Sequence, residues 1–168
     1  LGYPSAGSWI NYGLGSVNEN IPGYVVLKNK TSDPHGGASV FGNGFLPATT
    51  CGSFFNLDRK DPVNFIRPRN PLNEQRQNLD LMNQLDEGFA KRIAKAREIK
   101  SSMANYETAF KMQTAVPEVT DISKEPEHIK EMYGMNSKNE KVAKYGHQAL
   151  MARKMVEKGV RFVELSCA

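Results

Sequence analysis

The chain has 168 residues, enough to bury one hydrophobic core, and its 39% hydrophobic and 24% charged residues are globular values, so the chain as a whole is not a disordered tail. The net charge is +4, and no apolar run approaches the roughly 20 residues of a membrane-spanning helix, so we expect no membrane span. Cys51 and Cys167 stand far apart without a CxxC pair, which excludes a zinc site of that type and a disulfide framework.

Both ends of the chain indicate a piece of a longer protein. The first residue is Leu1 rather than Met, and a motif-like segment begins at Tyr3, before any element that could position it. A strand expected from Val160 to Leu165 is followed by only three residues. We therefore expect sequence to be missing on both sides; a complete small domain with processed ends is the alternative. No apolar run with a basic flank marks a secretory signal, so the residues themselves give no cellular address.

The first expected element is a short helix that starts near Ser5 and ends at Gly13 or Gly15. A helix start presents free backbone amides that stabilise anions. Ser5 is therefore our candidate catalytic nucleophile for the transfer of a phosphoryl or sulfuryl group, where metal ions would lower its effective pKa. Spacing alone favours a simpler role, in which Ser5 only caps the helix.

An apolar strand is expected next, from Tyr24 to Leu27, bounded by turn residues. From Asp33 to Phe55, glycines and prolines repeatedly interrupt regular structure, although interleaved phenylalanines favour an ordered loop. Residues 1–70 are thus expected to be loop-rich, with one short helix and one strand.

Residues 71–115 change character, because apolar residues recur every three or four positions from Leu79 to Phe110. One continuous helix of roughly 40 residues would span about 60 Å, which exceeds a small domain. We therefore expect two successive helices with a break near Asp86-Glu87-Gly88, and we expect Pro117 to end the block. The near-heptad spacing leaves a coiled coil as an alternative.

The last part of the chain predicts an α/β layer. Ser123 to Pro126 signals the start of a short helix that reaches Gly134. A longer helix is expected from Lys141 to Lys158, ended by Gly159 and followed directly by a buried strand from Val160 to Leu165. The fold class is therefore α/β, with a helix-rich middle portion and few strands. We expect a single partial domain over 1–168, made of the loop-rich segment (1–70), a helical layer (71–135) and a helix with a core strand (141–168).

The positive charge is concentrated in one segment of the helical layer: Lys91, Arg92, Lys95, Arg97 and Lys100. Such a basic face could attract nucleic acid or a sulfated polymer. However, apolar residues fall on another face of the same segment, which is typical of a solvated helix surface packed on a core. We favour the solvated surface and expect no nucleic-acid partner, and we keep an anionic ester or a sulfated polymer as the candidate substrate.

Arg67 and Arg69 are candidate substrate-binding residues, because an arginine fork binds sulfate or phosphate through paired hydrogen bonds. Turn formation around the neighbouring prolines explains the same residues equally well. The histidines His35, His128 and His147 are scattered, and the sequence contains no HxH or HExxH motif, so we assign no metal ligand. His35, in its glycine-rich loop, is the least improbable one.

A series of short segments carries a resemblance to a known family, through their shared order rather than through any one motif. The segments are Pro4 to Trp9 with Gly13-Leu14-Gly15, Gly44-Phe45-Leu46-Pro47, Tyr106-Glu107 to Phe110-Lys111-Met112-Gln113, Val116-Pro117-Glu118, Asp121 to Pro126, Tyr133-Gly134, and Leu150-Met151-Ala152-Arg153 to Val156 through Leu165. On these residues the chain resembles, over nearly its whole length, the bacterial family catalogued as domain of unknown function 1501.

The resemblance implies a protein related to sulfatases and alkaline phosphatases, of whose fold this chain would be an internal part. It implies export by the twin-arginine route to a periplasmic or extracellular location, and ester hydrolysis that depends on a divalent metal. In the family, a carboxylate-bearing first strand lies before the equivalent of Leu1. Tryptophan-aspartate-histidine and later histidine motifs lie after the equivalent of Leu165, so the metal of the complete protein is expected to bind outside this chain.

The resemblance also bears on single residues. Ser5 is carried over as the nucleophile, because Ser5 to Gly15 is similar to the serine-bearing helix start of metal-dependent phosphomutases. Two positions depart from the family pattern: members commonly have His where this chain has Tyr3, and Tyr-Gln-Gly where it has Thr50-Cys51-Gly52.

Two functions stay open at this point. The first is a fragment of an exported sulfatase- or phosphatase-like, metal-dependent ester hydrolase, inactive as this isolated chain because the metal ligands lie elsewhere. The alternative is a non-catalytic helical binding or assembly module with a basic face, which the long helical stripe and the absent ligands suggest.

Overall fold

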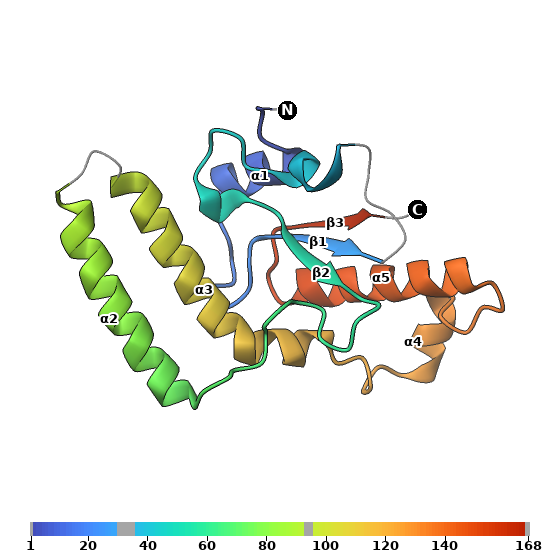
Figure 1. Cartoon of the computed structure of the whole chain (residues 1–168). Helices are drawn as coiled ribbons and strands as arrows, with labels where there is room; N and C mark the ends of the chain where they lie inside the picture. Colours follow the sequence, from blue (N-terminus) through green and yellow to red (C-terminus); the bar gives the residue numbers. More distant parts are fainter. Residues whose placement is uncertain (1, 30–35, 93–95, 167–168) are drawn as a thin grey trace.

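The computed structural model describes residues 2–29, 36–92 and 96–166 (Figure 1). Its helices are α1 (Ala6–Leu14), α2 (Leu72–Ala90), α3 (Ala96–Thr120), α4 (Glu127–Met132) and α5 (Glu140–Glu157). The strands are β1 (Tyr24–Lys28), β2 (Ser53–Asn56) and β3 (Phe162–Ser166), and two short 3₁₀ helices are η1 (Gly37–Phe41) and η2 (Ala48–Thr50). The expected α/β class, helix-rich with few strands, is confirmed.

The strands form one parallel sheet in the order β2-β1-β3. In the central strand β1, Val26 lies opposite Phe54 of β2 and Glu164 of β3. The strands expected near residues 24–27 and 160–165 are confirmed, whereas β2 was not expected. It is only four residues long and follows a glycine-rich loop, so it gives little periodic signal.

Both faces of the sheet are covered, which explains why β1 is an uninterrupted apolar run. Val25 and Leu27 belong to a core that α3 and α5 share, and both are fully buried. Tyr24 and Val26 point to the opposite face, where Phe41 of η1 completes a smaller core. Figure 1 shows α1 on one side of the sheet and α5 on the other.

α5 and β3 follow the local signals in the sequence. The side chain of Asn139 caps α5 by accepting a hydrogen bond from the backbone N–H of Lys141 at 3.0 Å. Gly159 follows the helix with φ 90°, a left-handed conformation that glycine adopts readily. The expected sequence of helix, glycine and strand is therefore confirmed.

Two successive helices in place of one long helix are confirmed, but two boundaries differ from those expected. α2 continues through 86–88 and ends at Ala90, because one glycine inside a helix costs only about 1 kcal/mol. α3 continues past Pro117 to Thr120. Val116 and Val119 are 1% and 2% exposed, so burial of these two side chains holds the last turn in place despite the proline.

α2 and the first half of α3 form a hairpin that projects from the sheet (Figure 1). Polar contacts bridge the two helices: Arg76 donates to Glu107 at 2.7 and 2.8 Å, and Asn83 donates to the same carboxylate at 2.8 Å. α3 has 25 residues. Neither α3 nor any other helix in the described ranges is long and apolar enough to cross a membrane.

Candidate functional site

Ser5 is the N-cap residue of α1. Its backbone is extended, with φ −68° and ψ 163°, and its Oγ accepts a hydrogen bond of 3.2 Å from the backbone N–H of Ser8. The expected helix between Ser5 and Gly15 is confirmed, and Gly15 is the C-cap. Capping is therefore a role that Ser5 performs in this structure, and a nucleophilic role would be a second use of the same oxygen.

A small network of hydrogen bonds surrounds the Ser5 hydroxyl. Ser8 is fully buried, and its Oγ can donate to the carbonyl oxygen of Gly42 at 3.1 Å. The Oγ atoms of Ser5 and Ser8 are 2.9 Å apart, and either can be the donor. Because Ser8 has a single hydroxyl proton, it donates either to Gly42 or to Ser5, and in the second arrangement the Ser5 proton is free to point toward Tyr24. The Ser5 N–H also donates to the Gly42 carbonyl at 2.9 Å, so Gly42 holds the start of α1 in place.

A buried tyrosine connects this network to the sheet. Tyr24 Oη donates to Glu164 Oε2 at 2.6 Å, between the neighbouring strands β1 and β3. Burial, and then the hydrogen bond to Glu164, raise the pKa of Tyr24 above its ordinary value, while a hydrogen bond with Ser5 acts in the opposite direction. Tyr24 thus keeps its proton at neutral pH, donates to the Glu164 carboxylate and has the Ser5 hydroxyl as a neighbour that affects its pKa.

Glycines let the backbone approach the Tyr24 ring. A Cβ added at Gly7 of α1 would lie 2.5 Å from the ring, and one added at Gly52 would lie 2.9 Å from it. At the other end of α1, Arg161 Nε donates to the carbonyl oxygen of Gly15 at 3.2 Å, just before β3 begins. α1 therefore runs antiparallel to the strands, with its N-terminus toward their carboxyl ends, the edge at which open parallel sheets bind ligands.

Arg67 and Arg69 lie in the loop between β2 and α2. Arg67 Nε donates to Asp61 at 2.9 Å, and the Arg67 side chain is 64% exposed. The guanidinium of Arg69 stacks over the ring of Phe65, 5.4 Å from its centre. This loop packs on the sheet face that α3 and α5 cover, whereas Ser5 lies on the face of α1. The structure does not bring the arginines to Ser5, and substrate binding by them stays a prediction.

The described histidines do not form a metal centre. His147 of α5 is half-buried, and burial lowers its pKa against the opposing influence of Asp58. His128 is exposed on α4, and His35 lies outside the described residues. Within 2–29, 36–92 and 96–166, no three His, Cys, Asp or Glu side chains gather as metal ligands would. That part of the chain does not fit a metal ion by itself.

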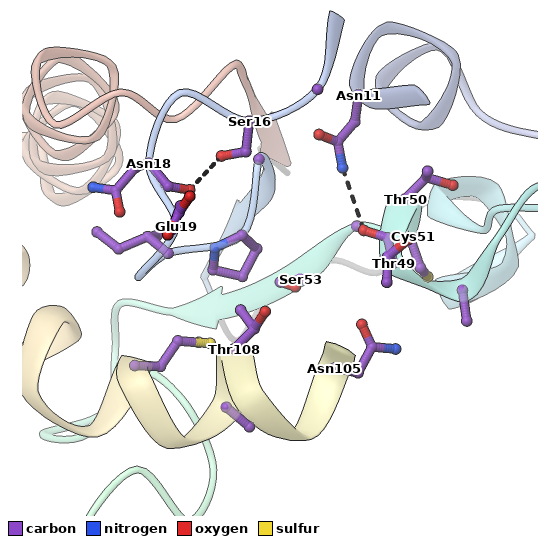
Figure 2. Close-up of a pocket in the computed structure, with 18 of the residues that line it drawn as sticks. Asn11, Ser16, Asn18, Glu19, Thr49, Thr50, Cys51, Ser53, Asn105 and Thr108 are labelled. Atoms are coloured by element: carbon purple, nitrogen blue, oxygen red, sulfur yellow. Dashed lines mark hydrogen bonds between the residues drawn. The ribbon is translucent and has the colours of Figure 1, made fainter. Parts of the chain in front are cut away.

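A hollow of about 600 Å³ lies beside the amino ends of β1 and β2 (Figure 2). Its lining mixes apolar side chains with eight that carry a hydroxyl or an amide: Asn11, Ser16, Asn18, Thr49, Thr50, Ser53, Asn105 and Thr108. Two hydrogen bonds tie part of it together, from Asn11 Nδ2 to the Thr49 carbonyl and from Ser16 Oγ to the Asn18 carbonyl. Nothing in the sequence predicts this hollow, because its residues come from separate segments that meet only in the fold.

The basic segment spans the turn between α2 and α3, and its Lys95 lies outside the described residues. Its other cations, Lys91, Arg92, Arg97 and Lys100, are exposed. Arg97 Nη2 donates to the carbonyl oxygen of Phe45 at 3.4 Å, which ties the start of α3 to the loop before η2. The exposed cations agree with the expectation of a solvated helix surface.

Comparison with known proteins gives one result. The family model described as "Protein of unknown function (DUF1501)" matches residues 1–168. No curated protein and no solved structure matches the chain. The family inferred from the order of the short segments is therefore confirmed, while a relation to sulfatases and alkaline phosphatases stays a proposal.

Proposed function

We propose that this chain, which belongs to the DUF1501 family of proteins of unknown function, is the nucleophile-bearing part of an exported, metal-dependent hydrolase of sulfate or phosphate esters. One observation supports the proposal most directly. The Ser5 hydroxyl stands at the N-terminus of α1, close enough to Tyr24 to lower its pKa, and Tyr24 in turn donates a hydrogen bond to the Glu164 carboxylate. The free amides of a helix start attract an anionic ester, and the linked carboxylate can accept a proton from the nucleophile.

The three side chains define a proton path. Ser5 Oγ attacks the phosphorus or sulfur atom, and the bond from that atom to the leaving oxygen breaks. The Ser5 proton passes to Tyr24 Oη while the Tyr24 proton passes to Glu164 Oε2. Glu164 then gives its proton to the leaving oxygen, and water hydrolyses the ester formed on Ser5. Tyr24 is neutral before and after the transfer, in keeping with its raised pKa.

The metal in this proposal belongs to the complete protein. The described residues offer no set of ligands, so no step on Ser5, Tyr24 or Glu164 is assigned to a metal. A divalent ion would supply charge neutralisation of the ester and a lower effective pKa for the nucleophile. The isolated chain is accordingly expected to be inactive.

The assay is turnover of aryl sulfate and aryl phosphate esters by the complete protein with zinc, calcium or manganese. Ser5→Ala and Ser5→Gly both remove the nucleophile, but glycine is the better N-cap, so the two variants differ in stability. We expect both to lower kcat by about a thousandfold or more, since the nucleophile is lost in each. Ser5→Thr retains a hydroxyl and is expected to retain part of the activity.

Ser16→Ala is the matched control, because among the described residues the Ser16 hydroxyl bonds only the nearby Asn18 carbonyl, in an exposed turn. We expect its activity to equal that of the wild type. If instead the kcat of each variant fell only as its stability fell, with Ser5→Gly close to the wild type, Ser5 would only cap α1. Absence of turnover with every metal and both ester classes would refute the hydrolase itself.

A second function, a non-catalytic assembly module, is supported by a different part of the molecule. Leu81 and Leu85 of α2 are 57% and 65% exposed, so one helix face presents two neighbouring large apolar side chains to solvent. α2 lies away from α1 in Figure 1, so assembly through α2 and chemistry at Ser5 are compatible in one protein.

A further inference from the structure

Exposed residues recur at a regular spacing on the side of α2 that faces away from α3. Leu79 and Ala90 are buried and face α3. On the opposite side, residues at alternating spacings of four and three are all exposed, and we call them the outer face of α2: Glu74, Asn78, Leu81, Leu85, Gly88 and, in the turn that follows the helix, Arg92. This spacing is the heptad seam by which one helix packs along another.

The outer face of α2 is complementary to itself in the reverse direction. If two α2 helices lie antiparallel with a two-fold axis at the level of Asn83, Leu81 of one meets Leu85 of the other, and Asn78 meets Gly88. The same axis places Glu74 of each copy opposite Arg92 of the other. A surface that matches its own reversed copy in this way is what an isologous dimer requires.

We propose that the outer face of α2 binds α2 of a second copy of this chain, antiparallel, with Leu81 and Leu85 at the centre and a Glu74–Arg92 ion pair at each end. The end groups are available for such pairs. Glu74 makes no ion pair with any described residue, and Arg92 uses only its Nε, in a 3.1 Å hydrogen bond to the carbonyl oxygen of Gly88.

The geometry of α2 permits a close approach. A Cβ added at Gly88 would meet nothing within 4 Å, so the backbone is open to a neighbour at that point of the seam. A helix of 19 residues is about 28 Å long, and one seam of that length falls below the roughly 800 Å² per partner of a standard interface. The dimer is therefore expected to be weak and to form only at higher protein concentration. The ion pairs at its ends should then contribute measurably to its affinity.

Charge exchange tests the arrangement by sedimentation of the complete protein over a range of concentrations. Glu74→Arg places arginine against Arg92 at both ends, and Arg92→Glu places glutamate against Glu74. Each single change replaces two attractions by two repulsions, and we expect it to weaken the dimer about tenfold at low ionic strength. The double variant Glu74→Arg/Arg92→Glu exchanges the signs and is expected to restore most of the affinity.

Glu87→Arg and Lys91→Glu are matched controls, because they make the same changes of charge on α2 away from the outer face. Both are expected to dimerise like the wild type. A protein that is monomeric at every concentration overturns the proposal. A dimer that responds equally to Glu74→Arg and Glu87→Arg, or that the double variant fails to restore, overturns it as well.

Discussion

The sheet and the projecting α2 differ in how they bury apolar side chains. In β1, four consecutive apolar residues from Tyr24 to Leu27 are fully buried, because helices or loops cover both faces of the strand. α2 buries Leu79 and Ala90 but exposes Leu81 and Leu85. Elements of the same chain thus cover both faces of β1, whereas no described residue covers Leu81 and Leu85 on α2.

Different interactions hold the two regions together. The sheet depends on interdigitated apolar side chains of β1, α3 and α5, whose loss leaves cavities. The hairpin depends on a polar bridge, in which Arg76 and Asn83 of α2 share the Glu107 carboxylate of α3. The hydrogen bond to Arg76, above all, lowers the pKa of Glu107. Substitutions of the same kind should therefore have unequal effects in the two regions.

The largest difference is expected for leucine truncation. Leu27→Ala removes a fully buried side chain between β1, α3 and α5 and should lower the free energy of unfolding by about 2–5 kcal/mol. Leu85→Ala removes an exposed side chain, and at protein concentrations too low for dimers it should change that free energy by no more than about 0.5 kcal/mol. Urea unfolding measures both. Equal losses would mean that α2 is as well covered as the sheet.

A pair of helix-interior glycines sharpens the same comparison. In α5, a Cβ at Gly146 would lie 2.1 Å from the carbonyl oxygen of Tyr133, a backbone atom that cannot rotate away. Gly146→Ala should lower the free energy of unfolding by about 1–3 kcal/mol. In α2, Gly88 has open space around it, and Gly88→Ala should raise that free energy by about 0.5–1 kcal/mol. Changes of the same sign in urea unfolding would contradict this account.

The smallest effect concerns alkaline pH. The pKa of Tyr24 is raised in the folded protein, so its contribution to stability is complete below the ordinary tyrosine pKa of about 10 and is lost as pH rises beyond it. Between pH about 9 and about 11, the wild type should lose about 1 kcal/mol more stability than Tyr24→Phe. Urea midpoints at the two pH values measure this difference. Parallel losses in both proteins would show that Tyr24 titrates freely.

Local signals account for the parts of the fold that could be predicted. The turn residues around β1, the cap at Ser5, and Gly159 between α5 and β3 each act within a few residues of their own position. The first break lies after Ala90 instead of near 86–88, and α3 passes the end expected at Pro117, for a related reason. The local cost of the glycine and the proline, about 1 to 3 kcal/mol, is smaller than the helix contacts that oppose it, such as the burial of Val116.

The candidate site could be predicted only in part. Ser5 could be identified from the sequence because helix starts have a local signature. Tyr24 and Glu164 were not, since they are 140 residues apart and only the pairing of β1 with β3 brings them together. For α2, the near-heptad spacing was visible in the sequence. Which side of the helix remains exposed depends on its packing against α3.

The position of β1 between β2 and β3 has a consequence for the order of folding. Because β3 occupies residues 162–166, the central strand obtains its second neighbour only after the intervening helices have been synthesised. The α2–α3 hairpin needs only contacts between sequence neighbours and can form early, whereas closing the sheet requires a loop of well over a hundred residues. Until that closure, one edge of β1 stays unpaired, and the nascent chain exposes an apolar strand to other chains.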